Sequence, residues 1–257
     1  MAMVFVIFSF IGTEIIAVTA GEAKNPSTAV PRAMRTMLGR LILFYLGAIT
    51  VLIAIVPWNQ IQPGSDVTAS PFVKVFQLIG VPAAAHLVNF VVITAAASSM
   101  NCNLYLVSRM IFSLARSGYA PEPLGRVSAR GAPVRALLVS AGGLAVALVV
   151  SFLYPDSAYV YMFGVAIFGG LYTWLVIFLT HLFFRRKWNG PGLPVRLIGY
   201  PWTSLSGIAA ILAIMATCWF VEGMRVSIIA GVSWLALLTI GYGFVRRRPA
   251  SHIFRRL

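Results

Sequence analysis

The sequence predicts an all-α membrane protein, with residues 1–257 forming a single transmembrane domain of seven transmembrane helices. Hydrophobic side chains make up 60% of the chain and charged side chains only 10%, a balance that does not suit an ordinary water-soluble surface. Apolar runs recur, each close to or above the roughly 20 residues that a helix needs to cross about 30 Å of hydrocarbon. Their length favours helices over barrel strands, in which apolar and polar residues alternate over about 10 positions.

The apolar runs place the expected helices in order along the chain. We expect spans at residues 1–20, 37–57, 84–113, 134–154, 159–184, 204–222 and 226–245. Between the second and third spans, residues 70–80 are too short to cross a bilayer and predict an amphipathic helix outside it. The sequence NGPGLP at residues 189–194 predicts a loop.

The positive charges predict the orientation of the spans. All of the 20 basic residues except Lys74 and Arg225 fall in or beside alternate connections, and such connections are retained on the cytoplasmic side. We therefore expect a multi-pass protein of the cell membrane, in a bacterial inner membrane, with a cytoplasmic C-terminus. The basic residues are dispersed over four loops, which argues against a nucleic-acid surface.

The same topology starts outside the cell and has an odd number of spans, which predicts that an N-terminal part is missing. A cleaved signal peptide with VTA before Gly21 is the alternative. It lacks a positively charged start and would carry Glu14 inside its apolar core, so we favour the missing part.

Few residues in the chain could carry out catalysis or bind a metal. Cys102 and Cys218 lie in different spans without a neighbouring metal ligand, and no nucleophile, zinc or phosphate-loop motif is present. The sequence therefore predicts no catalytic residue, no metal site, no cofactor and no enzymatic activity.

Glu14 is the one acidic residue of six that lies well inside an expected span. A charged side chain at the bilayer centre costs roughly 2.5 to 3.5 kcal/mol on insertion scales, so such residues usually face a protein interior or an aqueous cavity. The small or polar residues Ser9, Gly12 and Thr13 precede it and permit the helix to break. Glu14 has either a functional role or a structural one, in which its carboxyl group ties neighbouring helices together.

The third and fifth spans hold further candidates. Thr94, Ser98 and Asn101 follow one another at helical spacing, on one face of the third span. They line a permeation path or, equally well, connect packed helices. The fifth span contains aromatic residues and glycines for which packing in the protein core is the favoured interpretation: Tyr161, Phe163, Gly164, Gly169 and Gly170.

Three stretches of the chain resemble one known family. FSFIGTE followed by GEAKNPSTAVPRAM resembles the sixth transmembrane helix and the next loop of amino-acid permeases of the APC superfamily. SRMIFSLARSGYAPEPLGRVSARGAPVRAL resembles the end of helix eight and the basic loop before helix nine, and THLFFRRKW resembles the end of helix ten. The likeness runs from helix six to helix twelve and is closest to the branch with aminobutyrate, aromatic and proline permeases.

The resemblance implies a LeuT-like fold of two inverted repeats of five helices plus two more. The chain would then hold the second inverted repeat and the two extra helices of an N-terminally truncated permease without its first five helices. The implied function is secondary active transport of amino acids, coupled to protons or another cation. The alternative is a truncated fragment that does not transport, or half of a split permease with a separate N-terminal half. Because no acidic pair or buried basic residue suggests a charged substrate, a neutral amino acid is favoured.

The resemblance also implies a substrate site in the first span. In the family, the break in this helix offers backbone carbonyls to the amino group of the substrate. The matching positions here are Phe8, Ser9, Ile11 and Gly12, with Phe8 at the position of an aromatic gate. Glu14 matches an acidic position that either supports the broken helix or takes part in proton movement.

Overall fold

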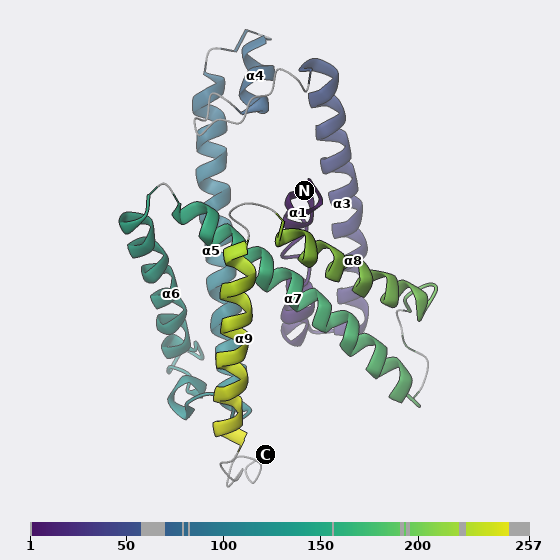
Figure 1. The fold of residues 1–257 in the computed structure, drawn as a ribbon, viewed down its shortest axis with the longest axis vertical. Coiled ribbons are helices and arrows are strands. Elements are labelled where there is room, and N and C mark those ends of the chain that lie inside the picture. The colour runs from purple at the N-terminus through teal and green to yellow at the C-terminus, as the bar shows by residue number, and fades with distance from the viewer. Residues whose placement is uncertain are drawn as a thin grey trace. The chain divides into compact units, whose positions relative to one another are not determined.

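The computed structural model of the chain is helical. It describes residues 2–57, 70–78, 80–81, 83–155, 157–190, 193, 196–220 and 225–246. No strand occurs among these residues, which confirms the all-α class (Figure 1). In the described part of the chain, five helices are long and apolar enough to cross a membrane: α3 (Pro26–Ile55), α5 (Ala84–Arg116), α6 (Val134–Leu153), α7 (Ala158–Lys187) and α9 (Arg225–Arg246).

Two of the expected spans differ from a single long helix. The first, residues 1–20, is divided between α1 (Ala2–Phe8), α2 (Ile15–Val18) and the short 3-10 helix η1 (Thr19–Glu22). The sixth corresponds to α8 (Trp202–Cys218), which is apolar but has only 17 residues. The end of that expected span, residues 221–222, lies outside the described residues.

The second expected span begins earlier than its apolar run. We placed its start at residue 37 and assigned the basic residues before it to a connection, but α3 begins at Pro26. Proline suits the first position of a helix because its fixed φ is helical and a first-turn N–H has no intrahelical acceptor. As a result, Arg32 and Arg35 lie on α3 itself, together with Arg40, which the expected span already contained.

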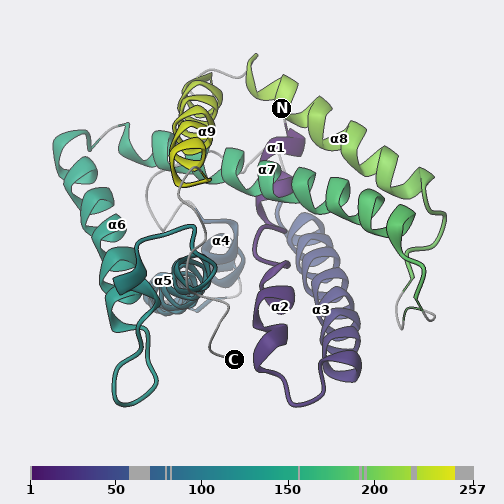
Figure 2. The same ribbon diagram turned by 90° about the horizontal axis from the view of Figure 1, so that it is seen from below.

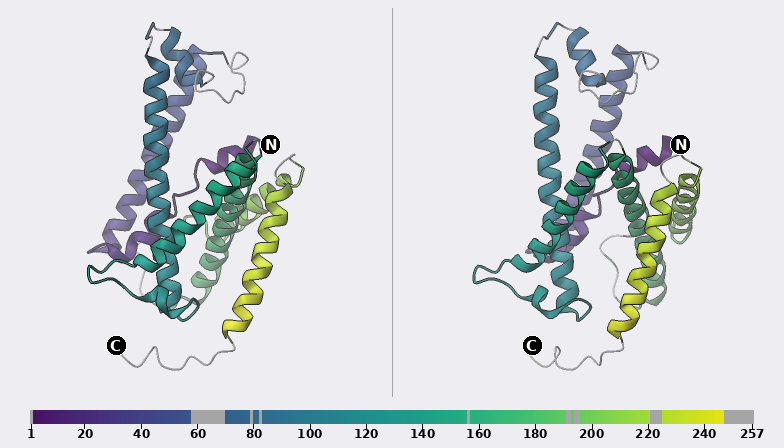
Figure 3. Two further views of the ribbon diagram at one scale, coloured as in Figure 1. Left: turned by 90° about the vertical axis from the view of Figure 1, so that its left-hand side faces the viewer. Right: turned by 60° about the vertical axis from the view of Figure 1, so that its left-hand side comes forward.

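The chain divides into two compact units, which we describe separately. The first comprises residues 1–14 and 107–257, and the second comprises residues 15–106. In the second unit, α2 and η1 pack against α3. The short helix expected at residues 70–80 is present as α4 (Pro71–Leu78), which packs against α3 and buries Val73 (Figure 3).

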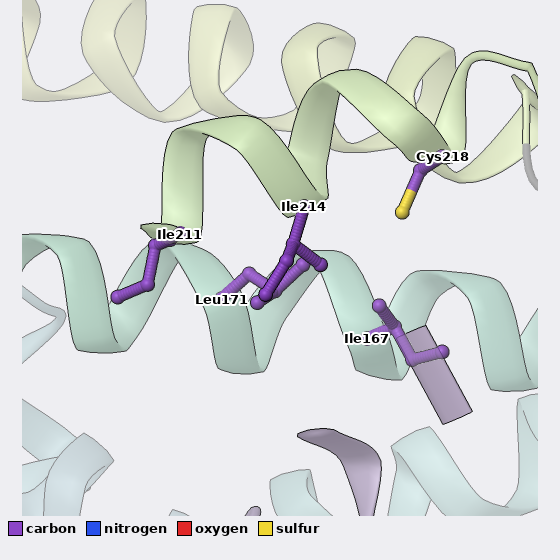
Figure 4. Close-up of a cluster of buried hydrophobic side chains, with 5 residues drawn as sticks. All are labelled: Ile167, Leu171, Ile211, Ile214 and Cys218. Carbon is purple, nitrogen blue, oxygen red and sulfur yellow. The ribbon is translucent and has the colours of Figure 1, made fainter. Parts of the chain in front are cut away.

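The core of the first unit forms around α7, which packs against both α8 and α9 (Figure 2). Its buried side chains come from α7 and α8: Ile167, Leu171, Ile211, Ile214 and Cys218 (Figure 4). Ile7 of α1 and Phe163 and Trp174 of α7 pack against this cluster. Helix α1 thus packs against α7, the helix at the centre of the unit.

Glycines allow helices of the first unit to approach closely. A Cβ atom at Gly164 of α7 would overlap Ser227 Oγ of α9, and one at Gly207 of α8 would lie 2.7 Å from Phe178 Cζ of α7. Small residues at such crossings let backbones pack in membranes. This agrees with the core interpretation for Gly164, whereas Gly169 is exposed, and a Cβ atom added there would meet no other helix within 4 Å.

Large apolar side chains are exposed along the candidate spans. No residue is buried in the most apolar part of α3, where Leu43, Phe44 and Leu46 are all more than 60% exposed. An apolar surface of this extent is unfavourable in water and natural in hydrocarbon. The exposure pattern therefore agrees with the membrane location that composition predicts.

Candidate functional site

The first helix is interrupted where the sequence allows a break. Helix α1 ends at Phe8 and α2 begins at Ile15. Between them, backbone N–H groups donate three residues back and not four: Ser9 to Val6, Phe10 to Ile7, Ile11 to Phe8 and Thr13 to Phe10, at 3.0 to 3.3 Å. Gly12 has a φ of 104°, a backbone conformation that glycine adopts without the steric cost of a Cβ atom. We call residues 9–14 the interrupted segment.

The carboxyl group of Glu14 joins the interrupted segment to α7. Its Oε2 accepts a hydrogen bond from the Gly12 backbone N–H at 3.0 Å and from the Trp174 indole N–H at 3.1 Å. Both hydrogen bonds are partly buried. A carboxyl oxygen has lone pairs for both donors, so one atom of Glu14 connects the backbone of the interrupted segment to the side chain of Trp174.

Aromatic rings of α7 lie beside Phe8, the last residue of α1 before the interrupted segment. The ring centroid of Phe8 lies 4.4 Å from that of Phe163, and Phe163 is stacked at 5.7 Å on Tyr159. Phe8 remains 37% exposed, so part of its ring is free to contact another molecule. Phe163 was expected in the protein core, and the structure places it both against the core cluster and beside Phe8.

The interrupted segment also fits closely against a glycine of α7. A Cβ atom at Gly170 would overlap Ile11 Cδ1 and lie 2.9 Å from Ile11 Cγ1. Gly170 is buried, and Ile11 is partly buried. Close packing against Gly170 therefore fixes the position of Ile11, and hydrogen bonds from Gly12 and Trp174 fix that of Glu14.

The polar residues of the third expected span belong to the second unit, on α5. Thr94, Ser98 and Asn101 are exposed there, and Thr94 Oγ1 donates to the backbone oxygens of Phe90 at 2.9 Å and Val91 at 3.0 Å. The structure thus brings Phe8, Ser9, Ile11, Gly12 and Glu14 together in the first unit, and it describes the α5 residues separately. Their role in lining a pathway stays a prediction.

Trp174 is the residue that sequence reasoning missed. An indole N–H inside an apolar helix needs an acceptor, because leaving it without one is costly. Glu14 is the one acidic residue inside an expected span, so pairing the two was a possible inference from composition. Among the described residues, no group of three His, Cys, Asp or Glu residues could hold a metal ion.

Together these features define a multi-pass helical membrane protein with an interrupted helix, a class in which irregular backbone lines a protein cavity or pathway. A family model described as amino acid permease matches residues 1–254. The chain therefore belongs to the amino acid permease family, as the resemblance of its motifs indicated.

Individual relatives agree along nearly the same stretch. The chain is 36% identical over 256 residues to the probable threonine/serine transporter YbxG of Bacillus subtilis (strain 168), covering 97% of the chain and 54% of the relative. It is 35% identical over 254 residues to the gamma-aminobutyric acid permease of the same organism, covering 98% and 53%. It is 36% identical over 249 residues to the aromatic amino acid transport protein AroP of Escherichia coli (strain K12), covering 95% and 53%.

The chain thus spans about half the length of the curated relatives it matches. No solved structure matches the chain.

Proposed function

We propose that the chain forms helices six to twelve of an amino-acid transporter with a LeuT-like fold, within one transmembrane domain. The proposal counts seven membrane-crossing segments: the five long helices, the shorter α8, and the interrupted first helix formed by α1 and α2. It is supported by the family match over residues 1–254 and by the share of about half that the chain covers in each relative. The transport is secondary and active, and it is coupled to protons across a bacterial inner membrane, with the C-terminus in the cytoplasm.

The double hydrogen bond of Glu14 is the observation that carries the proposal. Non-helical backbone at membrane depth is tolerated where it is buried in protein or lines a cavity, and Glu14 holds such backbone against α7. In the proposed site, the backbone around Ser9, Ile11 and Gly12 receives the amino group of the substrate. Phe8 covers the bound substrate, because its ring is partly exposed beside Phe163.

Glu14 has two roles in this proposal. It maintains the shape of the interrupted segment through Gly12, and it exchanges a proton during the transport cycle. Both roles use the same oxygen, since a change in the charge of the carboxyl group changes the strength of the hydrogen bonds from Gly12 and Trp174. Thr94, Ser98 and Asn101 are proposed to line the pathway from α5.

The substrate is proposed to be a neutral amino acid. Apart from Glu14 and the small Ser9, the residues proposed for the site and the rings beside Phe8 are apolar or aromatic: Phe8, Ile11, Phe163 and Tyr159, which stacks on Phe163. Such surroundings favour an uncharged substrate side chain, because a charge would be desolvated without a partner. The relatives are named for threonine and serine, gamma-aminobutyric acid and aromatic amino acids, so the class of substrate is proposed and not one compound.

A second candidate is that the chain acts as one half of a split permease, or does not transport at all. The coverage of about half of each relative favours it. In that case, we expect liposomes containing this chain alone to take up no amino acids, because about half of the length of each relative has no counterpart in it. Saturable uptake driven by an ion gradient in such liposomes would contradict this candidate.

The proposed function is tested in a complete transporter made by joining this chain to the N-terminal half of the gamma-aminobutyric acid permease of Bacillus subtilis. Uptake of labelled amino acid into proteoliposomes is measured with and without a proton gradient. We expect Glu14→Gln to abolish gradient-driven uptake, and Glu22→Gln, an acidic residue close in sequence, to leave it unchanged. Equal loss in the two variants would refute the special role of Glu14.

Replacing Trp174 shows whether uptake depends on its hydrogen bond to Glu14 or only on the packing of its aromatic ring. Trp174→Phe keeps an aromatic ring and removes the indole N–H donor to Glu14. Hydrogen bonds to charged groups are worth about 1.5 to 3 kcal/mol, so we expect gradient-driven uptake to fall about tenfold or more. A change in the pH dependence of uptake is also expected, whereas a loss of packing alone would lower uptake equally at all pH values.

A further inference from the structure

A groove with a volume of about 670 Å³ lies between α2 and α3 in the second unit. Ile16 of α2 forms one wall, and a face of α3 forms the other. None of its lining residues is among those proposed to bind substrate, and the function proposed above does not use the groove. Two arginines line it, and none of its described lining residues is acidic.

The α3 wall consists of two parallel stripes. Arg32, Thr36 and Arg40 are spaced four residues apart, so they follow one another along one side of the helix. Ala29, Ala33, Met37 and Leu41 form the next stripe at the same spacing, and Phe44 lies beyond both stripes, four residues after Arg40 and three after Leu41. The groove thus has a cationic and hydroxyl-bearing edge beside an apolar edge.

The position of the groove along α3 places these edges at the membrane boundary. From Leu38 to Ile55, α3 carries one charged residue, Arg40, and these 18 residues span about 27 Å, close to the thickness of the hydrocarbon layer. Arg32 therefore lies in the polar layer beside it, and Arg40 lies where an arginine can extend its guanidinium group toward water. Phe44 lies about 18 Å further along the helix than Arg32, on the hydrocarbon side.

We propose that this groove binds an anionic glycerophospholipid, with its phosphate between Arg32 and Arg40 and an acyl chain along the apolar edge. Guanidinium groups bind phosphate oxygens through paired N–H donors, and Thr36 supplies a hydroxyl group between the two arginines. Met37, Leu41 and Phe44 offer the apolar surface that an acyl chain requires. Such a lipid joins α2, which follows the interrupted segment, to α3.

The charge of the groove selects the lipid head group. A phosphatidylglycerol carries a net negative charge, which complements two arginines without an acidic neighbour among the described lining residues. A phosphatidylcholine carries the same phosphate but adds a quaternary ammonium group that the arginines repel. The groove therefore distinguishes the two lipids even when their acyl chains are identical.

The test measures lipid binding to the purified full chain by native mass spectrometry in detergent. Phosphatidylglycerol and phosphatidylcholine with identical acyl chains are titrated separately. We expect tighter binding of phosphatidylglycerol, and a loss of about fivefold in its affinity for each of Arg32→Gln and Arg40→Gln. Arg35→Gln removes an exposed arginine of the same helix that does not line the groove, and it should leave the affinity unchanged.

A second variant tests whether the acyl chain contributes to binding, by comparing phosphatidylglycerol with inorganic phosphate. Ala33→Leu adds an apolar side chain in the groove without changing the charge, and we expect it to weaken phosphatidylglycerol while leaving the weak binding of inorganic phosphate unaltered. Equal losses in the Arg35 and Arg40 variants would mean general surface attraction and would overturn the proposal. So would inorganic phosphate binding as tightly as the lipid, or an Ala33→Leu variant that binds the lipid normally.

Discussion

Replacing Gly164 by alanine tests how closely α7 and α9 pack. The new Cβ atom would overlap Ser227 Oγ and lie 3.1 Å from Ser227 Cβ and 3.8 Å from its Cα. Rotation of the Ser227 side chain can move Oγ away, but it cannot move Cβ. Since Ser227 is only 4% exposed, there is little free space into which its hydroxyl group can turn. The helices must therefore separate slightly or repack.

The expected effect is a loss of stability. Overpacking of a well-packed interior costs about 1 to 3 kcal/mol, while alanine gains about 0.5 to 1 kcal/mol over glycine within a helix. Gly169→Ala in the same helix provides the matched control, because no heavy atom lies within 4 Å of its Cβ position. Thermal unfolding of the purified chain in detergent should give a lower midpoint for Gly164→Ala than for Gly169→Ala.

The double variant Gly164→Ala with Ser227→Ala shows whether the contact itself is responsible. Ser227 Oγ has no hydrogen-bond partner among the described residues, so its removal loses little and gives the new methyl group room. We expect the double variant to be more stable than Gly164→Ala alone. Equal midpoints for Gly164→Ala and Gly169→Ala, with no recovery in the double variant, would refute the close packing of α7 and α9.

Two further predictions concern other contacts of α7. Gly170→Ala should push Ile11 away from α7, because there is no room for another carbon atom between Gly170 and Ile11. We therefore expect a higher KM for the amino acid in the joined transporter. An unchanged KM would show that Ile11 does not shape the site. His181→Phe should lower the thermal midpoint by removing the partner of the fully buried Ser204, whose hydroxyl lies 2.9 Å from His181 Nδ1. A buried polar group left without its partner costs about 1 to 3 kcal/mol. Adding Ser204→Ala to His181→Phe removes that group and should restore part of the stability. A double variant less stable than His181→Phe alone would contradict this.

Local features of the sequence were sufficient to predict the interruption of the first helix. Ser9, Gly12 and Thr13 together weaken helical hydrogen bonding. Gly12 has a positive φ, a backbone conformation that glycine adopts with little strain. The start of α3 was misplaced for a related reason. Pro26 and Pro31, together with nearby charges, suggest a connection, although proline at a first helical position begins a helix and does not end it.

Contacts between distant parts of the chain could not be predicted in the same way. The bond from Trp174 to Glu14 joins residues 160 positions apart, and no local pattern encodes such a separation. Gly169 and Gly170 are adjacent residues of the same type, yet a Cβ atom added at Gly170 would overlap Ile11, whereas one added at Gly169 would meet no other helix within 4 Å. Which face of α7 meets another helix depends on the packing of the unit, which hydropathy alone does not provide.

In the seven-helix arrangement proposed above, the shortness of α8 has a consequence for the lipid bilayer around the protein. Its 17 residues extend about 26 Å, several ångströms less than a typical hydrocarbon layer. Trp202 begins the helix and Trp219 directly follows it, and both indoles are exposed, as expected for side chains at the two water interfaces. The hydrophobic mismatch favours a bilayer that is locally thinner beside α8, at a cost of fractions of a kcal/mol per Å. Lipids with shorter acyl chains should therefore collect along this helix.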